Sequence, residues 1–328
     1  MRGRRRWLKF RLADPQRHLA GVRLSQHACL SDVDFTFEEH QAAWRLEPRR
    51  FEGWRLEYRL LLRHLDGTTE EICDPGNPKR VPGPFGERSV AERADYAPPA
   101  WLDTPPAAGT WRELVIDTRT LDAPVHASVW SPMTATDRVL VAHDGPEFAR
   151  LAHLGQYSAA GLVPAHHLVL LAPSDRNEWY SANPAYADAL AGDVLPRLAG
   201  EFGTALVGMG ASLGALAMLH TQHRHPGAFG ALFLQSGSFF QPRFDAQEAG
   251  FVRYQRIVRF VQHVSRPACP VALTCGRVEE NLCNNRAMAT TLGVPLAEVP
   301  DGHNMIAWRD ALHPHLTGLL RTVWRGDA

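Results

Sequence analysis

Residues 205–214, Ala-Leu-Val-Gly-Met-Gly-Ala-Ser-Leu-Gly, contain the pattern G-x-S-x-G between Gly210 and Gly214. A short apolar run precedes the pattern and an alanine- and leucine-rich segment, 213–223, follows it. We therefore predict a strand, a sharp turn and a helix. In that context Ser212 occupies a strained turn, and the small residues at positions 210 and 214 let the strand and the helix approach closely. The turn would push the Ser212 hydroxyl out at the end of a sheet.

Short apolar runs alternate with helical patterns on both sides of this turn. The expected strands are 125–130, 139–143, 168–172, 205–208, 231–235 and 271–275. The expected helices are 184–199, 213–223, 284–292 and 305–322. Alternating strands and helices predict an α/β fold with a mostly parallel sheet that is covered on both faces. Such sheets carry their sites at the carboxyl ends of the strands.

The sequence changes character near residue 104. Before it, residues 54–62 alternate apolar and polar side chains, as half-buried strands do, and Asp66-Gly67 is a hairpin-turn signal. Segment 74–86 contains four prolines and predicts an ordered loop. We therefore expect a small all-β sandwich with its linker over residues 1–104 and the α/β domain over 105–328.

Composition excludes several classes of protein. The chain has 35 basic and 35 acidic residues and a formal net charge of +0, so nothing suggests binding to nucleic acid or to an anionic membrane surface. No stretch reaches the ~20 apolar residues that span a bilayer, and no signal-peptide core follows the basic start. The five cysteines are an odd number without metal-type spacing. We expect a cytoplasmic protein with reduced thiols, no metal and no organic cofactor.

A nucleophilic serine needs a base, and the base needs an acid that orients it. With this kind of turn the chain order is serine, acid, histidine. His303 lies in the turn-rich loop 299–304 before the C-terminal helix and is the expected base. His313 and His315 fall within that helix, around a proline, and we expect them at the surface.

The acid should follow a strand. The expected strand 271–275 leads into Gly276-Arg277-Val278-Glu279-Glu280. Either Glu279 or Glu280 could hold the imidazole of His303, while the other would cap the next helix or face solvent. Glu279 is the first choice, and Glu280 is the alternative.

An oxyanion would need two donors. The backbone N–H of Leu213 lies at a helix start, which favours negative charge. The second donor should come from the loop after strand 139–143, where Gly145 allows a close backbone approach to a substrate. Asp144 beside it could contact the substrate or serve as a turn residue.

Further motifs accompany the G-x-S-x-G turn. They are His143-Asp144-Gly145, Gln235-Ser236-Gly237-Ser238, Cys275-Gly276-Arg277-Val278-Glu279, and Gly302-His303-Asn304-Met305 continuing to Trp308-Arg309. Together they resemble the esterase family that includes enterochelin esterases and, more distantly, S-formylglutathione hydrolases and mycolyltransferases. The resemblance covers the whole C-terminal domain, about two thirds of the chain.

The resemblance implies the α/β-hydrolase fold and a carboxylic ester hydrolase that works through an acyl-enzyme. It supports Glu279 as the acid and implies a small-molecule substrate, such as a siderophore-type lactone or a peptide ester. Residues 54–62 and 74–86 look like the immunoglobulin-like domain that precedes the hydrolase domain in enterochelin-esterase-like proteins. The sequence departs at Asp301-Gly302-His303-Asn304, where relatives often have Gly-Gly-His-Asp, and this alters the surroundings of the histidine.

Four residues are candidates for substrate binding: Asp144, Arg176, Glu178 and Tyr180. Relatives carry a similar Arg-x-x-Glu segment after a strand. Arg176 could contact an anionic substrate through two bonds, or it could form an ion pair with Glu178. Tyr180 and Trp179 could line the pocket or simply pack.

The sequence therefore predicts a serine esterase with a Ser-His-Glu triad. Two other interpretations stay open. One is an acyltransferase of the same fold, in which an alcohol replaces water. The other is a non-catalytic binding protein whose β domain recognises a glycan or a peptide. The natural ester and the oligomeric state are left open.

Overall fold

The computed structural model describes residues 8–30, 32–84 and 86–325. Its contacts divide the chain into two compact units. The first unit is Met1–Ala97 with two later loops, Gly276–Glu280 and Pro300–His303. The second unit is Pro98–Cys275, Asn281–Val299 and Asn304–Ala328. The domain limits drawn from the sequence, 1–104 and 105–328, stay a prediction.

The first unit contains two antiparallel sheets. One has the order β1 (Phe10–Ala13), β4 (Ala43–Leu46), β3 (Thr36–Glu38). The other has the order β2 (Leu19–Gln26), β5 (Arg55–His64), β8 (Arg88–Glu92), β7 (Arg80–Val81), with β6 (Thr69–Ile72) paired to β5. Along β5, Leu56, Tyr58, Leu60 and Leu62 are buried in alternation, as the sequence pattern predicted. Both sheets contribute to one apolar core, which confirms the β-sandwich.

Asp74 forms hydrogen bonds at the start of the proline-rich segment. The Tyr58 hydroxyl donates to Asp74 Oδ2 at 2.7 Å, and the Gly76 N–H donates to Asp74 Oδ1 at 2.8 Å. The segment also contains the two-residue strand β7, which the prolines had argued against.

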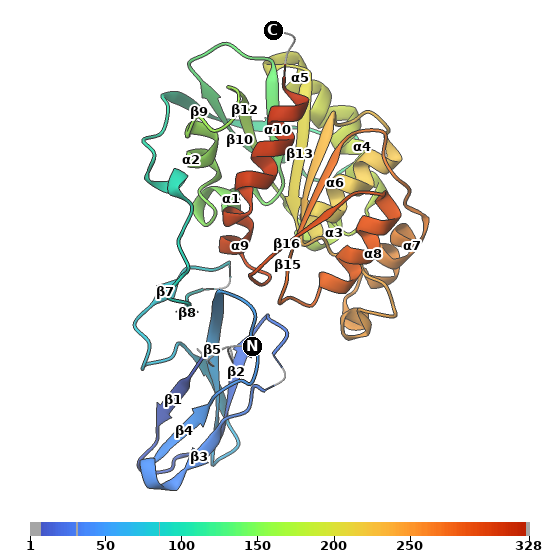
Figure 1. The fold of residues 1–328 in the computed structure, drawn as a ribbon. Helices are drawn as coiled ribbons and strands as arrows, with labels where there is room; N and C mark the ends of the chain where they lie inside the picture. The colour runs from blue at the N-terminus through green and yellow to red at the C-terminus, as the bar shows by residue number, and fades with distance from the viewer. Residues whose placement is uncertain (1–7, 31, 85, 326–328) are drawn as a thin grey trace. The chain divides into compact units, whose positions relative to one another are not determined.

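The second unit contains one eight-stranded sheet (Figure 1). Its strand order is β16 (Leu296–Val299), β15 (Val271–Gly276), β14 (Ala231–Gln235), β13 (Ala205–Ala211), β11 (Arg138–Ala142), β12 (His167–Ala172), β10 (Val125–Pro132), β9 (Gly109–Ile116). Strands β11 to β15 pair in parallel, whereas β10 is antiparallel to both β9 and β12. The mostly parallel sheet of the α/β-hydrolase fold is thus confirmed. The sequence patterns did not predict β9 and β16.

Ten α-helices are described. They are α1 (Gly145–Arg150), α2 (Leu154–Ala159), α3 (Arg176–Trp179), α4 (Pro184–Ala189), α5 (Leu195–Phe202), α6 (Leu213–Arg224), α7 (Tyr254–His263), α8 (Leu282–Leu292), α9 (Met305–Asp310) and α10 (Thr317–Val323). Shorter or irregular helical turns are Glu39–Gln41, Ala100–Asp103, Leu190–Val194, Ala246–Gly250 and Leu312–Leu316.

Helices cover both faces of the sheet. Along β11, Val139 and Val141 pack into one core with helices α4 to α8, while Leu140 and Ala142 pack into a second core with α1, α2, α9 and α10. This alternation is what a parallel sheet buried on both faces requires. Within the described ranges, no helix is both long enough and apolar enough to cross a membrane.

Two expected helices are interrupted. The segment 184–199 is α4 and α5 joined by a wider turn at Leu190–Val194. The segment 305–322 breaks at His313-Pro314, where His313 leaves helical backbone angles, because proline cannot donate the hydrogen bond that a helix interior needs. His313 is exposed as expected, and His315 is half-buried.

Candidate active site

Ser212 connects β13 to α6 in a strained conformation. Its φ is 56° and its ψ is −125°, a combination that non-glycine residues adopt only when the surrounding structure enforces it. A Cβ atom on Gly210 would lie 2.4 Å from the carbonyl carbon of Gly214. No side chain fits there, so the glycine permits the close approach of strand and helix that the motif predicted. The N–H of Leu213 follows at the start of α6.

A second serine lies beside Ser212. Ser212 Oγ is 3.2 Å from Ser238 Oγ, and the Ser238 N–H donates to the Ser212 carbonyl at 3.1 Å. Asn285 on α8 binds the loop after β14 that contains Ser238. Its Oδ1 accepts from the Gly237 N–H at 3.0 Å, and its Nδ2 donates to the Gly237 carbonyl at 2.9 Å. Sequence reasoning had not assigned Ser238 a role. The sequence feature that could have identified Ser238 is the Gln-Ser-Gly-Ser motif, which contributed to the resemblance.

His143 forms a hydrogen bond with the first turn of α6, directly after Ser212. Its ring is fully buried, and burial lowers the pKa of His143 to about 4, so the imidazole is neutral near neutral pH. The Gly214 carbonyl, 2.9 Å from Nδ1, can only accept, so Nδ1 carries the proton and Nε2 accepts from the Tyr186 hydroxyl at 2.8 Å. His143 therefore ties the end of β11 to the first turn of α6.

Two of the candidate substrate-binding residues bind each other. Arg176 Nε and Nη2 donate to Asp144 Oδ1 and Oδ2 at 2.7 and 2.8 Å, a bidentate ion pair. Burial disfavours the charged guanidinium, but the bonds to Asp144 outweigh it, and the pKa of Arg176 is raised. Glu178 instead forms ion pairs with Arg253 and Arg256. The Arg176–Glu178 ion pair considered from the sequence is thus replaced by an Arg176–Asp144 pair.

The other candidates in this region are tightly packed. Tyr180 is fully buried, its ring centroid lies 4.3 Å from that of His143, and burial raises its pKa well above the usual value. Trp179 stacks on Tyr186 with ring centroids 5.3 Å apart. A Cβ atom on Gly145 would lie 2.5 Å from the Leu170 carbonyl carbon, so this glycine lets α1 approach β12 closely.

The candidate base and acid form a pair within the first unit. His303 Nδ1 lies 3.3 Å from Glu279 Oε2. The Glu279 side chain is fully buried, and that of His303 is 26% exposed. This arrangement points the second ring nitrogen, Nε2, away from the carboxylate. Glu280, the alternative acid, is exposed, so the geometry favours Glu279.

The predicted site residues are therefore distributed over both units. His303 and Glu279 belong to the first, whereas Ser212, Leu213, Gly145 and the Asp144–Arg176 pair belong to the second. Among the residues that the structure describes, no three His, Cys, Asp or Glu side chains gather in a group that could hold a metal ion.

Comparison with known proteins finds similar esterases. Residues 165–317 match the family model described as "Putative esterase". The structure is similar to ferric enterobactin esterase from Salmonella typhimurium, with TM-score 0.72 and 19% identity over 97% of this chain and 93% of that one. It is likewise similar to the enterobactin esterase from Shigella flexneri, with TM-score 0.71 and 20% identity over 97% and 94%.

A third structure, S-formylglutathione hydrolase from Staphylococcus aureus, matches with TM-score 0.51 and 11% identity over 66% of this chain and 99% of that one. No curated protein sequence matches this chain. The resemblance to esterases expected from the sequence motifs is confirmed by the family-model match over residues 165–317, and the similar structures share the fold. Residues 165–317 are thus similar to an esterase family, and the second unit has the α/β-hydrolase fold.

Proposed function

We propose that the chain hydrolyses a small-molecule carboxylic ester by two-step acyl transfer, with Ser212 as the nucleophile. The strained backbone of Ser212 between β13 and α6 carries this proposal. A serine in such a turn presents its hydroxyl at the carboxyl end of a strand, beside the N–H groups at a helix start. Strain of this kind is retained where it serves a function.

In the first step Ser212 Oγ attacks the ester carbonyl carbon and its proton passes to His303 Nε2. Glu279 holds the Nδ1–H and stabilises the imidazolium that forms. The Leu213 N–H and the Gly145 N–H would donate to the oxyanion, each contribution being worth about 3 kcal/mol. The proton then goes to the departing alcohol. Water, activated by the same imidazole, hydrolyses the acyl-enzyme and releases the acid.

The substrate class that we propose is a siderophore-type lactone or a peptide ester. Support comes from the similarity to the two enterobactin esterases, which extends over 97% of this chain. The Asp144–Arg176 pair lies against the start of α6, since Asp144 Oδ2 is within 3.2 Å of a Cβ built on Gly214. We propose that this pair orders the polar side of the pocket. The odd number of cysteines fits a cytoplasmic enzyme.

The test is covalent labelling with a fluorophosphonate probe, with the modified residue mapped by mass spectrometry. We expect modification at Ser212 in the wild-type protein and none in Ser212→Ala or His303→Ala. The matched control is His313→Ala, which removes an exposed histidine from the same C-terminal segment and should label like the wild type. A folded wild-type protein that is not labelled at Ser212 would refute the proposed nucleophile.

The acid is tested with an adjacent pair of variants. Glu279→Gln should lower kcat for an activated ester on the order of 10³-fold, because the amide cannot stabilise the imidazolium. Glu280→Gln should leave kcat within about twofold, because this side chain is exposed. The reverse result would exchange their assignments. Adding a simple alcohol to the same assay separates hydrolysis from acyl transfer: an ester of that alcohol as the main product would favour the acyltransferase.

A further inference from the structure

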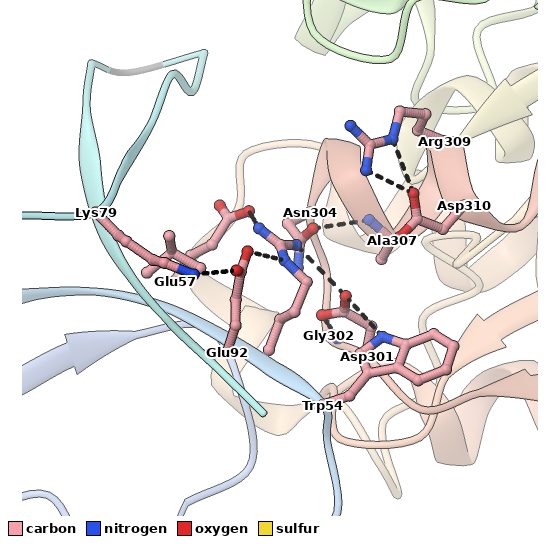
Figure 2. A network of polar contacts seen from close by, with 12 residues as sticks. Trp54, Glu57, Lys79, Glu92, Asp301, Gly302, Asn304, Ala307, Arg309 and Asp310 are labelled. Atoms are coloured by element: carbon pink, nitrogen blue, oxygen red, sulfur yellow. Dashed lines mark hydrogen bonds and ion pairs between the residues drawn. The ribbon is translucent and has the colours of Figure 1, made fainter. Parts of the chain in front are cut away.

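A buried polar network surrounds Asp301, two residues before His303 in the chain. Asp301 is 1% exposed, and its Oδ1 accepts from the Gly302 N–H at 2.7 Å. Its Oδ2 accepts from the Trp54 indole N–H at 3.3 Å and from Arg55 Nη1 at 3.5 Å. Figure 2 shows the side chains of Trp54 and Asp301 pointing toward one another. The network therefore includes the N–H of Gly302, the residue immediately before His303.

Arg55 is the centre of this network. Its side chain is 1% exposed, and besides Asp301 it pairs with Glu92 at 3.2 Å and with Glu57 at 3.3 Å. Lys79 donates to the other oxygen of Glu92 at 2.9 Å (Figure 2). Burial disfavours the guanidinium charge, but Asp301 and Glu57 outweigh it and the pKa of Arg55 is raised. A buried, forked cation of this kind fixes the positions of the carboxylates that it binds.

Backbone hydrogen bonds connect the same residues to both loops of the base–acid pair. The Trp54 N–H donates to the Pro300 carbonyl at 2.9 Å. The Asp301 carbonyl accepts from the Val278 N–H at 3.3 Å, which connects the histidine loop to the acid loop. The Cys29 N–H donates to the Val278 carbonyl at 2.7 Å, and the Val278 side chain packs into the sandwich core. Val278 immediately precedes Glu279.

These contacts define one path from the strand start at residue 55 to the imidazole. Arg55 and Trp54 fix the Asp301 carboxylate, which fixes the Gly302 N–H and hence the peptide before His303. On the other side of the histidine, the Asn304 side chain accepts from the Ala307 N–H at 2.9 Å (Figure 2) and caps α9. The contacts of Asp301 therefore restrain the backbone that precedes His303.

We propose that Trp54 and Arg55 are positioning residues for the catalytic base, acting through Asp301. This inference rests on the proposed function, in which His303 is that base. Asp301 supplies the carboxylate on which Arg55 acts. A displacement of the base by about 1 Å is enough to slow a reaction by about 10²-fold.

The test compares five single variants and one double variant in the full chain. Asp301→Asn retains the shape of the side chain and an acceptor for Gly302 but loses the charge that binds Arg55. Arg55→Met removes the cation, Arg55→Lys retains the charge without the fork, and Trp54→Phe removes only the indole donor. The matched control is Tyr58→Phe, which lies three residues after Arg55 on β5 and removes the buried hydrogen bonds of the hydroxyl to Asp74 and Asn77, neither of which belongs to the histidine loop.

The readouts are the rate of fluorophosphonate labelling, kcat and KM for an activated ester, and the melting temperature. Arg55→Met and Asp301→Asn should each lower kcat and the labelling rate by about 10- to 100-fold with KM within about twofold. Arg55→Lys should recover part of the loss, and Trp54→Phe should show a smaller one. The double variant Arg55→Met/Asp301→Asn should be no slower than the slower single variant, because both act on one path. Tyr58→Phe should lower only the melting temperature.

The outcomes separate this inference from the proposed function. Absence of labelling at Ser212 in the wild-type protein refutes the proposed function itself. The positioning role alone is refuted by a different combination of results. In that case the wild-type protein is labelled normally, His303→Ala is not labelled, and Asp301→Asn is folded with a kcat within twofold of the wild-type value. Should Arg55→Met fail to fold, the near-isosteric Asp301→Asn variant decides. A loss of kcat in Tyr58→Phe as large as that in Asp301→Asn would also overturn the inference, since general destabilisation would then explain both.

Discussion

Replacing His143 by Gln would test whether a neutral, buried imidazole supports the serine turn. The Gln side chain offers one donor and one acceptor, as the neutral ring does for the Gly214 carbonyl and the Tyr186 hydroxyl. Unlike the ring, it does not titrate. The groups around the ring are Asp144 and Arg176, whose charges act in opposite directions, and the uncharged Tyr180 and Tyr186. Burial is therefore the dominant cause of the lowered pKa.

The size of the effect follows from the pKa in the two states. Burial lowers the pKa of His143 to about 4 in the folded protein, whereas the ordinary value is 6.5. The unfolded chain thus binds the proton more readily. The stability that this histidine contributes is complete above pH ~6.5 and is lost as the pH falls toward ~4. Between about pH 7 and about pH 5, the loss is about 2 kcal/mol.

The assay is urea-induced unfolding at about pH 7 and about pH 5. The free energy of unfolding of His143→Gln should fall less between the two pH values than that of the wild type, by about 2 kcal/mol. His126→Gln, at an exposed position on β10, should reproduce the wild-type fall. If His143→Gln loses as much stability as the wild type over this range, His143 is not held neutral by burial and the assigned hydrogen-bond directions are wrong.

Three further substitutions test the surroundings of the serine. Gly210→Ala should cost about 3 kcal/mol or more, because its Cβ meets backbone at 2.4 Å, while Gly200→Ala, which meets nothing within 4 Å, should not lower the melting temperature. Asn285→Ala should lower the free energy of unfolding by about 2 kcal/mol, since it leaves the buried polar groups of Gly237 without these bonds, and an undiminished melting temperature would contradict this. Arg176→Lys should cost about 1 kcal/mol in thermal unfolding because the bidentate bond to Asp144 is lost; a variant as stable as wild type would show that the fork is dispensable.

The regular elements near the sheet centre were predictable because their signals are local. Apolar runs of strand length and the G-x-S-x-G turn identified α6 to within one residue and the start of β13, which extends three residues beyond the expected end at residue 208. The edge strands β9 and β16 were missed since neither reads as an apolar run: β9 is largely exposed, and β16 is only half-buried along its length. The break at His313-Pro314 was missed although proline signals it, because the apolar pattern continues on both sides.

The sequence by itself predicted the groups of the proposed chemistry: a serine at a strained turn, an acid after a late strand and a histidine in a loop, in that order. These follow from spacing and from backbone geometry, which act over a few residues. Only the tertiary structure decided which groups meet. It buries Glu279 and exposes its neighbour Glu280, pairs Arg176 with Asp144, and joins Arg55 to Asp301 across 246 residues of chain. No periodicity specifies such pairs, because burial and charge compensation depend on segments that are distant in the sequence.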